Sequence, residues 1–422
     1  MFVAARRHAE RVFARFMRAT RDAARVQERV LLEKIRRNAE SAFGRDYGFD
    51  RIRSADDFVR RVPILRYEDH RAYIERVKAG ETSAMFGGRQ RVHMFALTSG
   101  TSDEPKYIPV TDAFLKEYRA GWNAFGVKAL LDHPEGFLRR ILQVSSRMDE
   151  TRSAGGLPCG AITGLIAATQ KRLVRKYYVS PECLSRVEDP ASKYYAIMRL
   201  AVPVDVAFMI TASPATLLKL ARTAEQRAGE LIRDVQDGGV SSSVHLPGEV
   251  RRELAPRLLP DRAAARRLEA LIHTHGRLLP RHYWNLAFTA NWTGGTMGLY
   301  LRDFPEYFGP VPVRDVGLIA SEGRMSIPIA DGTAGGVLEV TSHFFEFVPA
   351  DRMEDVNPPA LRCHEVEAAG EYNILLTTSA GLYRYHIGDV VRVVGFEGQA
   401  PVIEFLNKGE HTCSLAGEKL TE

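Results

Sequence analysis

The sequence predicts an α/β protein in which two mixed or parallel sheets are flanked by helices, with a smaller β-rich part at about residues 336–405. Helical patterns alternate with single strands through the first part of the chain, and short strand-like segments then follow one another. The 422 residues are too many for one ordinary core, and 45% hydrophobic with 26% charged residues is typical of a globular protein.

Apolar periodicity, caps and breakers place the elements of the first part. Helices are expected at 1–43 (as one or two helices), 54–62, 67–77, 111–131, 192–200, 215–234 and 262–276. Strands are expected at 91–97, 140–145 and 204–210, with a strand-like segment at 108–111, and the Gly- and Pro-rich run 155–164 reads as a loop.

The second part changes character, because apolar and β-branched residues cluster in short runs separated by turns. Strands are expected at 286–288, 316–320, 336–341, 344–348, 372–377 and 390–396. Alternating helices and strands followed by many strands indicate more than one sheet.

Charge and cysteine usage favour a cytoplasmic protein without a membrane or nucleic-acid partner. The chain has no apolar run of about 18 residues and no secretory signal at its start. Its four cysteines form neither C-x-x-C pairs nor zinc-type clusters, as expected for free thiols in a reducing compartment. The net charge is +6, and residues 1–50 hold 12 basic and 7 acidic side chains at helical spacing, which is typical of a solvated helix face. A basic nucleic-acid or membrane contact is the alternative.

The segment L-T-S-G-T-S-D-E-P-K (97–106) carries four hydroxyls, a glycine and a lysine between two strand-like runs. Backbone N–H groups and hydroxyls can bind phosphate oxygens, glycine allows close approach, and lysine adds positive charge. The spacing differs from a Walker A motif. The segment predicts a triphosphate site, and a polar surface turn is the alternative.

Two acidic residues at the borders of β-rich runs suit the same ligand, Glu322 after one run and Asp389 before another. Glu322 comes at the end of G-L-I-A-S-E-G (317–323), and one carboxylate at a strand end can hold Mg²⁺. Asp389 lies in Y-R-Y-H-I-G-D-V-V (383–391), where it can accept two hydrogen bonds from ribose hydroxyls. An ordinary acidic turn residue is the alternative at each position.

Aromatic and small residues could line a pocket for an acyl or aryl group. They are Tyr283-Trp284, the turn N-W-T-G-G-T (291–296) and F-F-E-F (344–347). Each of them would equally suit an ordinary core.

In this order and spacing, these segments resemble the Gretchen Hagen family of acyl-acid amido synthetases, which belongs to the adenylate-forming superfamily of firefly luciferase and acyl-CoA synthetases. The resemblance runs through nearly the whole chain and includes Y-G-F-D-R-I-R-S-A-D-D-F (47–58), S-H-F-F-E-F-V-P (342–349) and the closing E-F-L-N-K-G with L-A-G-E-K-L-T-E. It implies the large domain of an adenylate-forming enzyme at 1–405, and a hinge with the start of a C-terminal lid at 406–422.

The resemblance also implies a role for each matching residue, with Lys106, Glu322 and Lys408 as the catalytic set. The nucleotide would be bound at its phosphates by Thr98, Ser99, Gly100, Thr101, Ser102 and Lys106, at adenine by Ala320 and Ser321, through Mg²⁺ by Glu322 and at the ribose by Asp389. Lys408 would lie in the hinge, and the acid pocket would be lined by Trp284, Thr293, Phe344 and Phe345.

Two features depart from the family pattern. Asp103 stands where the phosphate loop usually has glycine, and its charge repels a triphosphate unless the side chain turns away or meets the metal. The sequence ends at Glu422, shortly after G-E-K-L-T, so the lid is expected to be missing or supplied by another chain.

The expected reaction joins a small carboxylic acid to ATP, giving acyl-AMP and pyrophosphate, after which an amine or amino acid attacks to form an amide. Positioning and charge neutralisation suffice, because no protein nucleophile is needed. A thioester-forming ligase and a nucleotide-binding module without turnover are the alternatives. A serine hydrolase is disfavoured because no G-x-S-x-G follows a strand.

Overall fold

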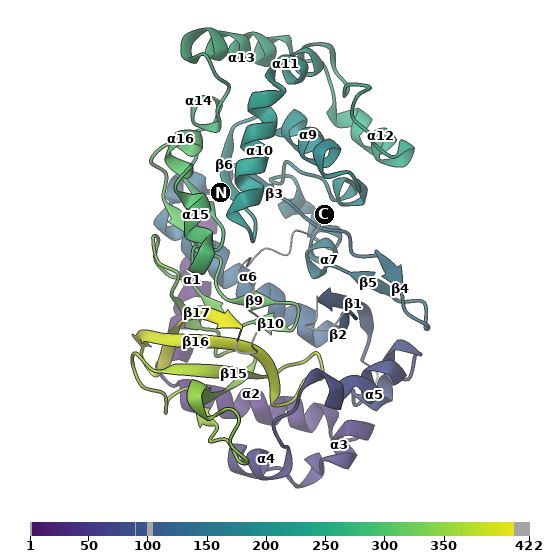
Figure 1. Cartoon of the computed structure of the whole chain (residues 1–422), viewed down its shortest axis with the longest axis vertical. Coiled ribbons are helices and arrows are strands. Elements are labelled where there is room, and N and C mark those ends of the chain that lie inside the picture. The colour runs from purple at the N-terminus through teal and green to yellow at the C-terminus, as the bar shows by residue number, and fades with distance from the viewer. Residues whose placement is uncertain (1, 89, 99–103, 409–422) are drawn as a thin grey trace.

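A computed structural model describes residues 2–88, 90–98 and 104–408. The molecule is elongated, with the N-terminal helices and a large antiparallel sheet at one end and the helices of residues 190–283 at the other (Figure 1). Within the described part of the chain, no helix is long and apolar enough to span a membrane.

The chain begins with five helices near the large sheet, α1 (Phe2–Thr20), α2 (Ala23–Asn38), α3 (Ala42–Asp46), α4 (Ala55–Arg61) and α5 (Tyr67–Lys78) (Figure 1). The expected helix at 1–43 is thus two helices and the start of a third. Ser54 caps α4 by accepting the Asp57 N–H at 3.1 Å. Gln27 of α2 donates to the carbonyls of Val340 and His343 at 2.8 and 2.6 Å, which anchors this helix to the sheet edge.

A small mixed sheet carries the hydroxyl-rich segment, with strand order β2 (Lys106–Thr111), β1 (Val92–Thr98), β5 (Pro158–Gly160), β4 (Thr151–Arg152). β1 and β2 form an antiparallel hairpin, and β2 runs directly into the long helix α6 (Asp112–Asp132). Thr111 caps α6 by accepting the Phe114 N–H at 3.1 Å, as its position before Asp112 predicted.

The loop expected at 155–164 is partly wrong. Phe95 and Ala96 pair in parallel with Cys159 and Gly160 of β5, so a Gly- and Pro-rich segment joins the sheet. Gly160 also lets the backbone of residues 147–148 pack closely against β5, because a Cβ there would lie 2.7 Å from the Arg147 carbonyl oxygen. The helix α7 (Ile162–Ala168) follows at once.

A four-stranded parallel sheet forms the centre of the molecule, in the order β3 (Arg140–Gln143), β6 (Val206–Ile210), β7 (Phe288–Ala290), β8 (Val313–Arg314). All five residues of β6 are buried, as its continuous apolar run predicted. β6 contributes Ala207, Phe208 and Ile210 to one core and Val206 and Met209 to another, so the sheet separates two cores.

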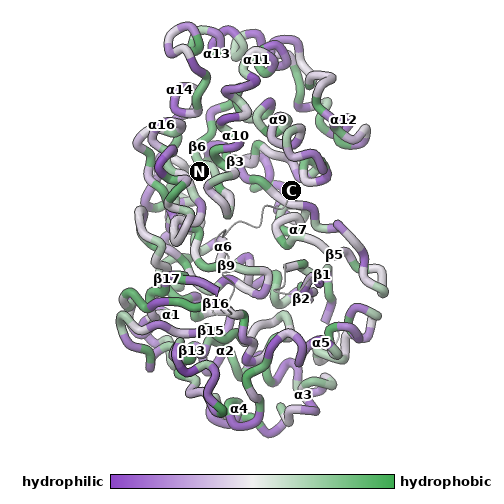
Figure 2. Tube along the Cα trace, in the orientation of Figure 1, coloured by the Kyte–Doolittle hydropathy of each residue, from purple (hydrophilic) through white to green (hydrophobic). Residues whose placement is uncertain are grey.

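Helices cover this sheet and extend the far end of the molecule: α8 (Arg172–Arg175), α9 (Pro190–Ala201), α10 (Pro214–Gln226), α11 (Ala228–Asp237), α12 (Gly248–Leu254), α13 (Arg262–His275), α14 (Pro280–Tyr283), α15 (Gly298–Leu301) and α16 (Phe304–Phe308). Hydrophobic and hydrophilic residues alternate along α11 and α13, as in helices with one buried face (Figure 2). The single helix expected at 215–234 is two helices, because Arg227 leaves helical geometry (φ −112°, ψ 26°) and binds Glu230 and Ser243.

The second part of the chain forms a seven-stranded antiparallel sheet, in the order β11 (Ser326–Ile327), β12 (Gly336–Leu338), β17 (Ala400–Lys408), β16 (Tyr385–Glu397), β15 (Glu371–Thr377), β13 (Phe344–Pro349), β14 (Leu361–Arg362). Of the strand expected at 316–320, only β9 (Ile319–Ala320) forms, and it pairs with β10 (Gly323–Arg324). β17 was not expected.

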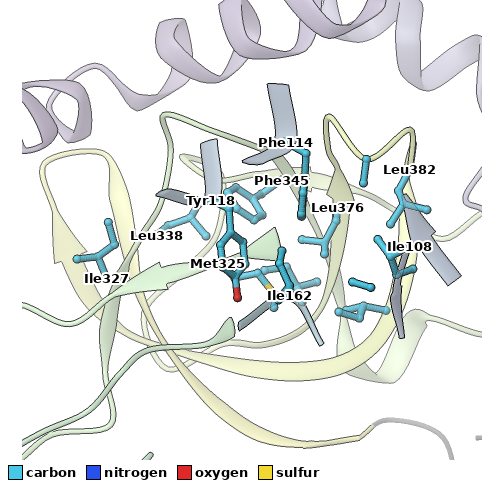
Figure 3. Packing of buried hydrophobic residues seen from close by; sticks show 14 of the residues in the cluster. Ile108, Phe114, Tyr118, Ile162, Met325, Ile327, Leu338, Phe345, Leu376 and Leu382 are labelled. Carbon is cyan, nitrogen blue, oxygen red and sulfur yellow. The ribbon is translucent and has the colours of Figure 1, made fainter. Parts of the chain in front are cut away.

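One core joins the hairpin, α6 and the large sheet. Figure 3 shows Ile108 of β2, Phe114 and Tyr118 of α6, Met325 next to β10 and Phe345 of β13 packed together. These side chains are almost fully buried. The same core includes Ile387 and Val391 of β16, so the segment that carries Glu322 shares one core with the strands that carry Lys106 and Asp389.

Candidate functional site

The hydroxyl-rich segment begins at the end of β1 and ends at the start of β2. Thr98 ends β1, Lys106 begins β2, and the two residues are register partners. The Lys106 ammonium lies 5.8 Å from the centre of the Tyr67 ring. Four predicted phosphate-binding residues between them lie outside the described part of the chain, and so does Asp103. The four are Ser99, Gly100, Thr101 and Ser102.

Glu322 lies in a two-residue turn between β9 and β10, where Gly323 pairs with Ala320. The neighbouring Ser321 donates its hydroxyl to the Leu97 carbonyl at 3.3 Å, which ties the turn to the end of β1. Ala320 and Ser321 are half-buried, whereas Glu322 is only 4% exposed. The turn therefore holds a buried carboxylate beside the start of the hydroxyl-rich loop.

Asp389 lies on the central strand β16 and is 3% exposed. Its register partner is Lys408, the last residue of β17, and the Lys408 ammonium forms an ion pair with the Asp389 carboxylate. The Lys408 side chain remains 53% exposed. Two residues predicted for different parts of the site, ribose and hinge, thus contact one another across two adjacent strands.

Electrostatic coupling joins the three segments. Burial raises the pKa of Glu322, and the negative charge of Asp389 raises it further, while Lys408 and Lys106 lower it. Burial likewise raises the pKa of Asp389, against the lowering effects of Lys408 and Lys106. Lys106 and Lys408 therefore stabilise the ionised forms of both acids, so these four charged groups lie close enough to act on one another.

Asp315, which the sequence did not single out, links the turn at Thr293 to the segment that leads into β9. It is 3% exposed and accepts the Thr293 N–H and hydroxyl at 2.6 and 2.7 Å on one oxygen, and the Gly317 N–H at 2.6 Å on the other. Burial raises its pKa, whereas these hydrogen bonds lower it. An aspartate directly after the strand-like run P-V-P-V-R was the available signal.

The predicted acid-pocket residues are not brought to one place. Trp284 is buried in the core on the α9–α13 side of the parallel sheet, where its indole N–H donates to the Ala201 carbonyl at 3.0 Å. Phe344 packs edge-on against Phe58 in a third core, and Phe345 is fully buried. Thr293 is half-buried beside Asp315. The assignment of these four residues to an acid pocket stays a prediction.

The acids present fit a hard cation that is bound mainly by a substrate. Among the described residues, no group of three or more His, Cys, Asp or Glu side chains could form a metal cage. Mg²⁺ usually takes one or two carboxylates together with substrate phosphates and water. Glu322, buried and flanked by Lys106 and Asp389, matches this donor set.

Comparisons with solved structures define the class of fold. The chain aligns with AtGH3.15 acyl acid amido synthetase in complex with 2,4-DB at a TM-score of 0.83 and 21% identity, over 95% of this chain and 70% of that one. A second structure, GH3.15 acyl acid amido synthetase, gives 0.81 at 22% identity, over 94% and 71%. At this identity the likeness establishes the fold alone.

Family models give the closer assignment. The GH3 family N-terminal domain matches residues 12–313 and the GH3 family central domain matches residues 336–408, so the chain belongs to the GH3 family. Jasmonoyl--L-amino acid synthetase JAR6 of Nicotiana attenuata is 25% identical over 98% of this chain and 74% of its own length. Indole-3-acetic acid-amido synthetase GH3.2 of Arabidopsis thaliana is 25% identical over 96% and 77%.

Proposed function

We propose that this chain uses ATP to activate a small carboxylic acid as its acyl-adenylate and then transfers the acyl group to an amine or amino acid. The observation that carries the proposal is the gathering of Lys106, Glu322 and Asp389 at the end of the β1–β2 hairpin, in a chain that belongs to the GH3 family. Relatives named as amino acid synthetases of jasmonic and indole-3-acetic acid support this reaction class.

Each residue acts on charge or position in this scheme. Lys106 and the hydroxyls of the loop, with Thr98 at its border, bind the phosphates, and Asp389 accepts the ribose hydroxyls. Ala320 and Ser321 border adenine. Glu322 holds Mg²⁺, which when bound neutralises phosphate charge. The acid then needs only to be aligned with the α-phosphorus, because the reaction requires no protein nucleophile.

Lys408 has two successive partners under this proposal. In the structure its ammonium pairs with the Asp389 carboxylate. When ribose hydroxyls take the Asp389 carboxylate, the half-exposed lysine is free to turn toward developing negative charge in the same site. The boundary expected at 405 falls inside β17, so the proposed large adenylation domain runs to Lys408 and the proposed hinge follows it. A lid domain, on this chain or another, would complete the amide step.

The acid is proposed as a small carboxylic acid, aryl, indolic or of medium chain length. The cytoplasm is the proposed compartment, since it supplies ATP and amino acids and keeps the cysteines reduced.

Pyrophosphate exchange across a panel of carboxylic acids tests the first step. Exchange that depends on one class of acid and on Mg²⁺ supports the proposal. ATP binding without exchange for any acid would reduce the chain to a nucleotide-binding module. Product analysis with amino acid and thiol acceptors tests the second step, and a thioester without amide would replace the amidation step by thioester formation.

A further inference from the structure

An arginine two residues after Glu322 is buried inside the protein. Arg324 is the second residue of β10 and is 1% exposed. Its guanidinium carbon lies 4.5 Å from the centre of the Trp122 ring and 5.0 Å from that of Phe125, both on α6. Arginine over aromatic faces is attracted by the ring quadrupoles, and the attraction is stronger away from water.

The rest of the guanidinium contacts the segment before β9. Its Nη2 donates to the Val316 carbonyl at 2.5 Å, and Val316 follows Asp315, the residue that binds Thr293 and Gly317. Its Nε and Nη1 atoms have no hydrogen-bond partner among the described residues. Burial lowers the pKa of Arg324 to about 10, and the nearby Tyr118, Glu339 and Asp315 act in the opposite direction.

The surface of α6 is shaped for this side chain. A Cβ atom at Gly121 would lie 2.7 Å from Cδ of Arg324, so any larger residue at position 121 would displace the arginine. Glycine in the middle of a helix is unfavourable for helix formation. The space it leaves is filled by Arg324.

These contacts connect the elements that carry the proposed nucleotide site. Helix α6 continues from the hairpin that holds Lys106, and Val316 directly follows Asp315 in the segment that leads into β9. Glu322 lies in the turn that precedes Arg324. We propose that Arg324 is a positioning residue that holds Glu322 at a fixed distance from the phosphate-binding hairpin. The inference rests on the proposed adenylation function.

Stability alone does not require this arginine. A buried charged group with unpaired N–H groups can often be replaced by an apolar side chain of similar volume without loss of stability. Positioning, by contrast, is sensitive to small displacements, because a shift of about 1 Å in a catalytic group can lower a rate by about a hundredfold. The two roles therefore predict different results for the same variants.

The experiment compares Arg324→Met, Arg324→Lys and Gly121→Ala with the wild type. Pyrophosphate exchange, the Mg²⁺ dependence of ATP binding by calorimetry, and the melting temperature are measured for each protein. We expect kcat for exchange to fall by about tenfold or more in Arg324→Met and Gly121→Ala, with weaker Mg²⁺ dependence of ATP binding and a melting temperature near that of the wild type. Arg324→Lys restores part of the rate.

Arg199→Lys is the matched control. Arg199 of α9 is 2% exposed and donates to the Gly239 and Leu259 carbonyls at 3.0 and 3.4 Å, in the core on the other side of the parallel sheet. We expect this variant to exchange pyrophosphate at the wild-type rate even where its melting temperature falls.

Two results would overturn the inference. One is an unchanged exchange rate in Arg324→Met and Gly121→Ala. The other is a fall in melting temperature that lowers exchange and ATP binding in parallel, which would mean a structural role only. If the wild type catalyses pyrophosphate exchange with no acid, the adenylation proposal fails. The positioning role is overturned separately if the Mg²⁺ dependence of ATP binding is the same in the wild type and in Arg324→Met.

Discussion

Replacing Asp389 by alanine removes the proposed acceptor of the ribose hydroxyls. Hydrogen bonds to a charged group contribute about 1.5–3 kcal/mol each, and loss of the acceptor leaves the hydroxyls to find water. Asp389 is only 3% exposed, so water replaces it poorly. Its partner Lys408 is half-exposed and can turn to solvent, so no buried charge is left unpaired.

The ribose hydroxyls replace the Lys408 ammonium as partners of Asp389, so we expect a net loss of about 1–3 kcal/mol in ATP binding, which corresponds to a Kd raised by about 5- to 150-fold. Calorimetric titration of ATP into wild type and Asp389→Ala measures this directly. Asp351→Ala, at an exposed aspartate in the turn after β13, is the matched control and should leave the Kd unchanged. An Asp389→Ala protein that remains folded and binds ATP with the wild-type Kd would refute the ribose assignment.

Three further predictions concern stability. Glu346→Leu leaves Arg384 without the buried carboxylate that accepts its Nε and Nη2 at 2.9–3.1 Å, so unfolding in urea should show a loss of stability of about 3–5 kcal/mol. The double variant Glu346→Leu/Arg384→Met should recover most of that stability, and additive losses from the two single variants would contradict the prediction. Burial raises the pKa of Glu339 to about 7 in the folded state, so the folded protein binds more protons than the unfolded chain and its stability falls as the pH rises toward and through that value. Glu339→Gln should therefore give a flatter profile of melting temperature between pH 5 and 9. Thr111→Ala removes both the cap of α6 and the hydroxyl that donates to the Ser379 carbonyl at 2.9 Å, and should cost about 1–2 kcal/mol in the same unfolding assay, whereas Thr111→Ser should retain most of the stability.

Local signals in the sequence were enough to predict many elements. β6 was predicted because all of its residues are apolar, and α6 because Thr111-Asp112 precedes a long helical pattern. β5 and β17 were not predicted, because their strand partners lie elsewhere in the chain. β5 is short and lies in a Gly-rich segment, and it is a strand because it pairs with β1 on one side and β4 on the other, while β17 is paired with β16 and β12.

The site shows the same division between local and long-range information. Glu322 and Asp389 each follow a recognisable local pattern, and the structure brings both near Lys106. The contact between Lys408 and Asp389 depends on the register of two strands whose bulges shift the pairing, which no local pattern reveals. Arg324 is invisible for a similar reason, since its partners Gly121, Trp122 and Phe125 lie about 200 residues earlier in the chain.

The parallel sheet separates two hydrophobic cores, and we expect substitutions in one core to have little effect on the other. β6 gives Val206 and Met209 to one and Ala207, Phe208 and Ile210 to the other, and the second is the one that packs around Glu322. Substitutions more than about 7–10 Å apart without shared partners usually have additive effects. We therefore expect that α9–α13 can accumulate mutations away from the shared strands, or be exchanged for those of a relative, while the opposite face of the sheet keeps the geometry of the proposed nucleotide site. This half of the protein is the place where we would build hybrids.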